Sequence, residues 1–550
     1  MPDRRPVPSP VATGFRSPRE RTLVPASAAD EGTTPSPTGT ELEGNIVATA
    51  KGTGYLAGGT FFAFGCRFVI ALVLARALGA EGYGLYVLGV SAAALFAGVS
   101  LLGIDDAMVR YVAILSRRGD RDGLSGTLQL GLVVSVLGGL AMGAVLFVCA
   151  GPIADGLFDE PELAQLLRLL AAVVPFLTLS SVLLGSARGF RQMGSAALAE
   201  TVVQSAVRMG LVIVLALAGW LHLYTAAIAF GLADVAASIT LIALLNRQFP
   251  LRAAFRLGGA RRDAREIFRY AIPLWLSGLM RQSRRNVQNV MLGAMTSIGN
   301  VGVFSIASQV SLVATTTSTS IYVSSRPPMA QLHDAGDRAA LSRLYATTSR
   351  WTFGLNVPFF LVIALYPEAI LGLFGGAFEH GATALIIVAF TGLVGAATGT
   401  CQGMIDMTGH TRVKLANAIL NTVVLVVGGA VLIPRHGVVG AAIASLIAVT
   451  AVNVASILEL WALERYLPFD RDWWKQVVAA SGALGLGIAL RTMSPVGTDP
   501  TSAVLQGAVV SLSYVGLVLA LGLAPDDRLV VGRVFGRIGL GRIAASWRSA

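Results

Sequence analysis

Three arginines lie close together within one apolar stretch of the chain, near residues 268–293. Arg281, Arg284 and Arg285, together with Gln288, follow the spacing i, i+3, i+4, i+7, which puts all four side chains on one face of a helix. An arginine near the centre of a bilayer costs about 2.5–3.5 kcal/mol, so this face must meet water or a partner. The planar guanidinium group suits phosphate oxygens. The stripe therefore predicts a phosphate-binding cavity.

A single acidic residue, Asp234, falls near the centre of another apolar stretch. A carboxylate at that depth is costly and is commonly paired or functional. Asp234 is a candidate for coupling transport to a proton or a sodium ion. The alternative is a simple ion pair with Arg208 or Arg168, which lie in neighbouring apolar stretches. The sequence leaves both open.

The elements that position these residues are predicted to be membrane-spanning helices. The 550 residues are 54% hydrophobic and 13% charged, with a mean hydropathy of +0.68, which is more apolar surface than a soluble core buries. A helix spans the hydrocarbon core with roughly 20 apolar residues. We expect an all-α polytopic protein with about fourteen spans, at 53–77, 84–104, 126–150, 165–186, 195–219, 224–246, 268–293, 299–325, 347–371, 381–407, 413–433, 438–462, 474–492 and 502–523.

Basic residues fall in every second predicted loop. With the N-terminus in the cytoplasm, the inward segments from residue 51 onward hold 28 Lys and Arg, whereas the outward loops hold three. This asymmetry predicts that both termini are cytoplasmic and that the number of spans is even. The net charge of +11 is thus spread over loops rather than gathered on one face, so no nucleic-acid partner is expected.

A pattern in the sequence returns after about 216 residues. The matching segments are Gly84-Leu85-Tyr86 with Gly302-Val303-Phe304, Gly119-Asp120-Arg121 with Gly336-Asp337-Arg338, Gly156-Leu157-Phe158 with Gly372-Leu373-Phe374, Gly194 with Gly409, and 226–229 with 441–444. Six predicted spans separate the copies, so both have the same orientation, as in transporters with parallel repeats. In such transporters the substrate site lies between the halves, which rock to expose it to each side in turn.

The repeat divides the chain into regions. We predict a disordered cytoplasmic tail (1–50), an N-lobe of spans 1–6 (51–247), a basic cytoplasmic linker (248–267), a C-lobe of spans 7–12 (268–465), a terminal pair of spans (466–523) and a basic amphipathic cytoplasmic tail (524–550).

Arg67 in the first span aligns with Arg285, or with Arg281 if a gap is placed four residues later. The repeat thus places a further arginine opposite the stripe and requires a span between Arg269 and Gly302. The alternative is that residues 281–289 form a cytoplasmic loop from which the arginines extend to water.

Other kinds of chemistry have little support. The three cysteines lie within predicted spans and the five histidines are scattered, so neither a disulfide framework nor a metal site is indicated. The sequence has no GxxxxGK[ST] phosphate loop. We expect neither a catalytic residue nor a cofactor, and the chain is not predicted to be an enzyme.

Several of these segments also carry a family resemblance. The motifs are residues 75–86 (ARALGAEGYGLY), Leu102-Gly103-Ile104, Arg110-Tyr111-Val112-Ala113, Ile272-Pro273-Leu274, Val301-Gly302-Val303-Phe304, Ile433-Pro434 and residues 437–442 (GVVGAA). They resemble those of Wzx-type polysaccharide (O-antigen) flippases, members of the multidrug, oligosaccharidyl-lipid and polysaccharide exporter superfamily. The resemblance covers roughly residues 50–490.

The resemblance implies a two-lobed transporter in the bacterial cytoplasmic (inner) membrane. Such a protein moves a polyprenyl-diphosphate-linked oligosaccharide from the inner to the outer leaflet through a central cationic cavity. Its partners would be that lipid-linked cargo, membrane lipids, and a polysaccharide polymerase or glycosyltransferases. Arg67, Arg281, Arg284 and Arg285 match basic residues of the first and seventh helices in related flippases.

Three other functions remain open at this point. A drug exporter of the same superfamily would be expected to concentrate acidic residues in its cavity, which the excess of arginine disfavours. A flippase for a peptidoglycan lipid precursor would need the same cavity chemistry. A membrane scaffold of a polysaccharide assembly complex would transport nothing itself.

Overall fold

The computed structural model describes residues 39–190, 202–249, 260–398, 401–407, 411–493, 500–524 and 527–528. The chain divides into two compact units, Met1–Lys51 and Gly52–Ala550. Most of the predicted N-terminal tail, much of the basic linker and nearly all of the C-terminal tail lie outside the described residues.

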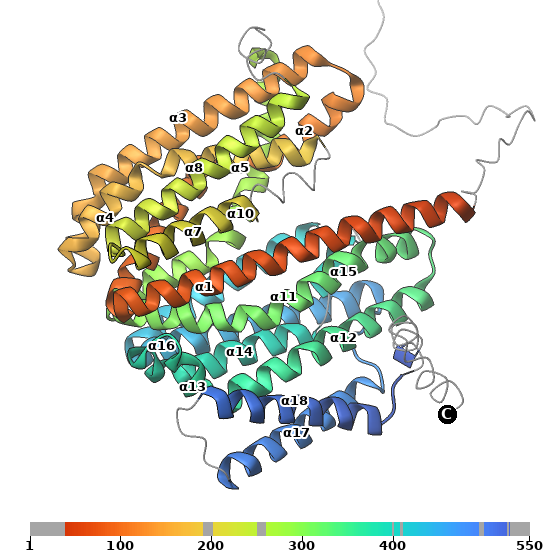
Figure 1. Ribbon diagram of the computed structural model, residues 1–550. Helices are drawn as coiled ribbons and strands as arrows, with labels where there is room; N and C mark the ends of the chain where they lie inside the picture. The colour runs from red at the N-terminus through yellow and green to blue at the C-terminus, as the bar shows by residue number, and fades with distance from the viewer. Residues whose placement is uncertain are drawn as a thin grey trace, which may run out of the picture. The chain divides into compact units, whose positions relative to one another are not determined.

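Helices make up the regular structure of the described residues (Figure 1). The N-terminal half holds α1 (Gly39–Ser100), α2 (Ile104–Arg118), α3 (Arg121–Ile153), α4 (Pro161–Ala171), α5 (Val174–Gly189), α7 (Gln204–Leu217) and α8 (Leu223–Gln248). The C-terminal half holds α10 (Ala260–Met295), α11 (Ile298–Asp334), α12 (Arg338–Leu365), α13 (Pro367–Gly372), α14 (Ala382–Ala397), α15 (Cys401–Met407) and α16 (Thr411–Glu464). They are followed by α17 (Trp473–Met493) and α18 (Pro500–Ala520).

Two of these helices are pairs joined at a glycine. Gly79 in α1 has φ 69° and Gly437 in α16 has φ 53°, and the backbone is not helical at either residue. Only glycine adopts this left-handed region readily, so the chain can turn there without a loop. Each of these two elements therefore contains two of the predicted spans.

The described residues include seven helices that are long and apolar enough to cross a membrane, or eight if the bent pair α4 and α5 is one span, by length and composition alone. Two of the seven, Phe62–Ser100 and Arg412–Glu464, have 39 and 53 residues, whereas roughly 20 suffice for one crossing. The all-α, multi-span fold class is confirmed. The count of fourteen spans stays a prediction.

The sequence repeat has a counterpart in backbone geometry. Gly119 and Gly336 both have positive φ, 68° and 70°. The next residue in each copy, Asp120 or Asp337, caps the following helix by accepting a hydrogen bond from the backbone N–H three residues later, at 2.9 and 3.0 Å. A glycine C-cap followed by an aspartate N-cap is a favourable way to join two helices. The repeated Gly-Asp-Arg motif thus forms the same turn between helices in both halves.

The two halves meet in a reciprocal helix contact. A Cβ atom added to Gly84 of α1 would overlap the carbonyl oxygen of Ile298 in α11, and one added to Gly302 would overlap the carbonyl oxygen of Ala80. In the repeat, Ala80 corresponds to Ile298 and Gly84 to Gly302, at the same spacing of 218. The two contacts therefore exchange under a pseudo-two-fold axis between the helices, as a parallel repeat requires.

A large hydrophobic core closes around this contact. It contains Leu74 and Tyr83 of the N-terminal half and Phe304 and Phe374 of the C-terminal half. The Arg76 Nε atom donates to the carbonyl oxygen of Leu373 at 2.8 Å, so a polar contact also joins the halves. This is the end of the helices that the predicted topology places outside the cell.

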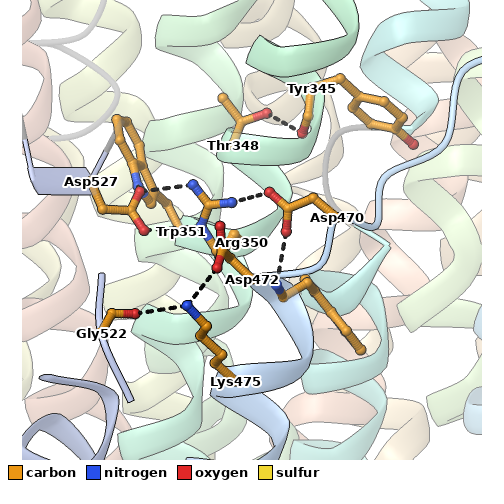
Figure 2. A network of polar contacts seen from close by, with 10 residues as sticks. Tyr345, Thr348, Arg350, Trp351, Asp470, Asp472, Lys475, Gly522 and Asp527 are labelled. Carbon is orange, nitrogen blue, oxygen red and sulfur yellow. Dashed lines mark hydrogen bonds and ion pairs between the residues drawn. The ribbon is translucent and has the colours of Figure 1, made fainter. Parts of the chain in front are cut away.

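The last helix pair is attached to the C-terminal half by a buried charge cluster (Figure 2). Arg350 of α12, only 2% exposed, pairs with Asp470 and Asp527, which flank α17 and α18 in the sequence. The indole N–H of Trp351 also donates to Asp527, at 2.7 Å. Helices α17 and α18 lie side by side (Figure 1) and pack on α12, so this cluster fixes their ends to the body of the protein.

Candidate functional site

Helix α10, which carries the arginine stripe, contacts both halves of the protein. Near its start, the Trp275 indole N–H donates to the carbonyl oxygen of Gly98 at 3.0 Å, and the Arg110 guanidinium lies 4.3 Å from the Tyr270 ring centroid. Farther along, α10 packs against α16. Pro273, which removes one helical hydrogen bond, lies in the part that contacts the N-terminal half. The stripe comes after this part, and beyond the stripe α10 contacts the N-terminal half again through Asn289.

Arg284 and Arg285 have exposed side chains although each lies well inside a long helix. At 1.5 Å per residue, they lie about 15 Å from the end of α10 at Met295, which would be near the middle of a bilayer core if the predicted span at 268–293 is correct. Arg67 of α1 lies at a similar distance from Gly79. The three positive charges interact, because Arg285 is repelled by both Arg284 and Arg67.

Arg284 and Arg285 line a cavity of about 590 Å³, which we call the C-half cavity. Its walls come from α10, α11, α12, α14, α15 and α16, all in the C-terminal half. None of its described lining residues is acidic. With two guanidinium groups and no carboxylate among the described residues of its wall, the cavity favours an anion. Arg67 is near Arg285 but does not line this cavity.

A second cavity, of about 640 Å³, adjoins the first, and we call it the mouth cavity. Arg284 and Gln402 line both cavities, so they lie at the boundary. Arg412 and Lys414, at the start of α16, add two cations to its wall, and Asp106 of α2 adds an acid. In the predicted topology, Arg412 and Lys414 belong to an inward loop, and the mouth cavity would lie toward the cytoplasmic side.

The other two residues of the stripe, Gln288 and Arg281, differ from Arg284 and Arg285. Gln288 is 7% exposed and donates to the carbonyl oxygen of Ala441 and to Ser445 Oγ, both at 2.7 Å. It borders the C-half cavity while it joins α10 to α16. Arg281 lies in α10, but its side chain is outside the described residues.

Asp234 lies apart from both cavities, in the N-terminal half. It is 2% exposed, and its Oδ1 atom accepts from Gln204 Nε2 at 2.7 Å. Arg208 interacts with it electrostatically, yet the Arg208 guanidinium donates to the Tyr86 hydroxyl and lies 4.6 Å from the Phe230 ring centroid. A smaller cavity of about 200 Å³ is lined by Asp234 and Gln204. The structure thus places Asp234 where a small ion, but no large cargo, has room.

Sequence reasoning missed several residues that the structure brings to the cavities. Arg412 and Lys414 were expected only as charges of a cytoplasmic loop. Their position in the first turn of a helix is the sequence signal that could have marked them as residues of a cavity wall. Ser311, Thr352 and Thr391 also line the C-half cavity. Isolated hydroxyls in apolar helices carry no signal of their own, because they bond to the helix backbone wherever they point. Among the described residues, no group of three or more His, Cys, Asp or Glu is arranged to hold a metal ion.

Comparison with known sequences gives three matches. Residues 49–333 match the protein family described as polysaccharide biosynthesis protein. Stage V sporulation protein B of Bacillus subtilis is 29% identical over 147 residues, which are 27% of this chain and 28% of that protein. A probable flippase, AglR, of Haloferax volcanii is 22% identical over 469 residues, which are 82% of this chain and 92% of that protein. The match to the sporulation protein therefore spans little more than a quarter of its length.

Solved structures share the fold. The lipid II flippase MurJ in an inward closed conformation has a TM-score of 0.67 at 12% identity, covering 84% of this chain and 98% of that chain. An inward-facing multidrug resistance MATE transporter of the MOP superfamily has a TM-score of 0.61 at 17% identity, covering 72% and 92%. These likenesses concern the fold, since one fold serves different cargoes.

Proposed function

Because the chain belongs to the polysaccharide biosynthesis protein family, we propose that it is a flippase for a polyprenyl-diphosphate-linked oligosaccharide. The cargo moves from the inner to the outer leaflet of the bacterial cytoplasmic membrane and is used for surface polysaccharide. The observation that carries the proposal is the pair Arg284 and Arg285 on the wall of a cavity with no acidic residue among its described lining.

The chemistry of a diphosphate fits this wall. Its oxygens only accept hydrogen bonds and carry negative charge, and each guanidinium offers a fork of donors that can hold two of them at once. Arg67, whose charge repels Arg285, adds a third cation from the other half. An anion between these groups relieves their mutual repulsion, so the bound cargo stabilises the arrangement.

Transport proceeds by alternating access in this proposal. The reciprocal contact of Gly84 and Gly302 supports a state closed at the outer end, while the mouth cavity leads from Arg412 and Lys414 to Arg284. Rocking of the halves about the glycine contact opens the outer end. Asp234, buried in the N-terminal half, is then available to couple this motion to a proton or a cation.

The proposed protein is a transporter, not an enzyme, with both termini in the cytoplasm. A polymerase outside and glycosyltransferases inside would consume and supply its cargo. A cation-exporting drug transporter has less support, because a cavity for cations needs carboxylates where this chain has guanidinium groups.

The test is transport in proteoliposomes that contain the purified chain and a fluorescent polyprenyl-diphosphate oligosaccharide. Arg284→Ala and Arg285→Ala should each reduce the flipped fraction to the level of empty vesicles, because a diphosphate loses its principal ligands. Arg118→Ala is the control, since Arg118 is exposed at the end of α2. Unchanged flipping by both cavity variants would contradict the proposal. If the native chain leaves the fluorescent label on one leaflet, the protein is a scaffold and not a flippase. Equal transport of a peptidoglycan precursor would point to the broader lipid-precursor flippase.

A further inference from the structure

The C-half cavity is also lined by hydroxyl side chains, which differ in character from its arginines. Ser311 of α11, Thr352 of α12 and Thr391 of α14 line it and are 4%, 3% and 8% exposed. We call these three residues the hydroxyl wall. They come from three different helices, so their convergence on one cavity is a product of the fold.

Each hydroxyl in this wall donates its proton to a backbone carbonyl oxygen of its own helix. Ser311 Oγ donates to the carbonyl oxygen of Ala307 at 2.9 Å, Thr352 Oγ1 to that of Thr348 at 2.6 Å, and Thr391 Oγ1 to that of Ile387 at 2.8 Å. A hydroxyl has one proton to donate and two lone pairs that accept. The hydroxyl wall therefore presents acceptors to whatever enters the cavity.

Asn453 of α16 adds a donor of the opposite kind. It lines the same cavity and is 7% exposed. Its Nδ2 atom has no hydrogen-bond partner among the described residues. A buried amide that lacks a partner is costly, and most buried amides in folded proteins are paired. The donor is thus placed to be satisfied by a ligand in the cavity.

These two features decide which ligand chemistry fits. A phosphate group offers only acceptors and negative charge, so it would be repelled by the hydroxyl wall and belongs at Arg284 and Arg285. A polyol offers O–H donors to the hydroxyl wall and oxygen acceptors to Asn453 at the same time. The cavity volume of about 590 Å³ is within the usual range of small-molecule sites, roughly 300–1,000 Å³.

We propose that the C-half cavity is a saccharide chamber, in which the hydroxyl wall and Asn453 bind the first sugars of the cargo while Arg284 and Arg285 bind the adjoining diphosphate. This inference rests on the proposed flippase function and adds a location to it. The saccharide lies inside the C-terminal half, whereas the sequence predicted a site between the halves.

Photocrosslinking in cells that make the polysaccharide tests this arrangement. Photo-leucine replaces Val449, which lines the C-half cavity, or Met280, which lines the mouth cavity. Val214, an exposed residue of α7, is the control position. Sugar on the purified adduct is detected by periodate and a hydrazide dye, and phosphate by a ³²P label, before and after mild acid breaks the glycosyl phosphate bond.

We expect the Val449 adduct to keep its sugar and lose its phosphate after acid treatment, and the Val214 position to give neither. A sugar-bearing adduct at Met280 with none at Val449 would overturn the saccharide chamber and leave the flippase proposal intact. The absence of sugar and phosphate from both cavity positions would overturn the flippase proposal, and the chamber with it.

A double substitution tests the hydroxyl wall itself. Thr352→Val with Thr391→Val keeps the shape of both side chains and removes two acceptors. The half-saturating concentration of a polyprenyl-diphosphate oligosaccharide should rise about tenfold, whereas binding of the same polyprenyl diphosphate without sugar should not change. Thr240→Val is the matched control, because Thr240 makes the same backbone bond, at 2.8 Å, outside the C-half cavity. Equal weakening for both ligands would contradict the role of the wall in sugar binding.

Discussion

A guanidinium group stays charged inside a membrane protein only where water or a polar partner reaches it. Arg284 and Arg285 meet this condition because their side chains border a cavity and are exposed there. Gln288, on the same helix face, is instead buried against α16. One face of α10 thus has two roles. Arg284 and Arg285 face the cavity, whereas Gln288 packs against α16.

Lysine provides a sharper test of these residues than alanine. Arg285→Lys keeps the positive charge but loses the planar fork that binds two oxygens at once. We expect the variant to insert normally and to flip a polyprenyl-diphosphate oligosaccharide about tenfold more slowly than the native chain. Initial rates in proteoliposomes measure the effect. Full activity of Arg285→Lys would show that charge alone is enough.

The helical spacing of the stripe could be predicted from sequence, whereas the surroundings of its members could not. Spacing identifies which side chains share a face, but coverage of that face depends on α16, which begins more than a hundred residues later. For the same reason, Arg67 could be matched to Arg285 by the repeat, while the hydroxyl wall had no signal. Its hydroxyls come from three helices and meet only in the folded protein.

At the scale of elements, the attachment of α17 and α18 depends on a few buried charges. Asp527 accepts from Arg350 through two hydrogen bonds of 3.0 Å and from Trp351 through one of 2.7 Å (Figure 2). Arg350 is buried, so its charge is expensive without these partners. The sequence predicted a terminal helix pair, but it gave no indication that Arg350 anchors it.

Asp527→Ala should therefore destabilise the C-terminal part of the protein. Loss of one partner of a buried ion pair costs about 3–5 kcal/mol, and we expect the lower end because Asp470 still contacts Arg350. Thermal unfolding in detergent should show a lower Tm, and limited proteolysis should release α17 and α18 earlier. Asp472→Ala is the control, since its pair with Lys475 is partly exposed and contributes about 0–1 kcal/mol. Equal Tm values for the two variants would contradict the anchoring role.

At the scale of the whole molecule, the contact of Gly84 and Gly302 is what closes the outer end in the proposed transport cycle. Sequence comparison of the two halves predicted that these glycines correspond, since each begins a matched motif. It could not show that they touch, because a repeat fixes orientation and not the distance between copies. The structure adds that each glycine packs on the backbone of the other half.

Gly84→Ala should shift the protein away from the closed outer end. Even a methyl group overlaps the carbonyl oxygen of Ile298, and backbone cannot move aside as a flexible side chain does. With Ser308→Cys as a reporter in the C-half cavity of a chain without its natural cysteines, a membrane-impermeant maleimide added outside should label Gly84→Ala faster. Gly210→Ala is the control, since a Cβ there meets no atom within 4 Å. Identical external labelling of the two variants would contradict the closure.

The glycine contact also bears on the origin of the chain. Ala80 meets Gly302 as Ile298 meets Gly84, which is the kind of contact that two identical subunits form about a two-fold axis. A single half-length ancestor that paired with itself would already have possessed it, so fusing two copies into one chain required no new interface at the crossing. Each copy could then acquire its own charged residues, such as Asp234 in the N-terminal half and Arg284 and Arg285 in the C-terminal half.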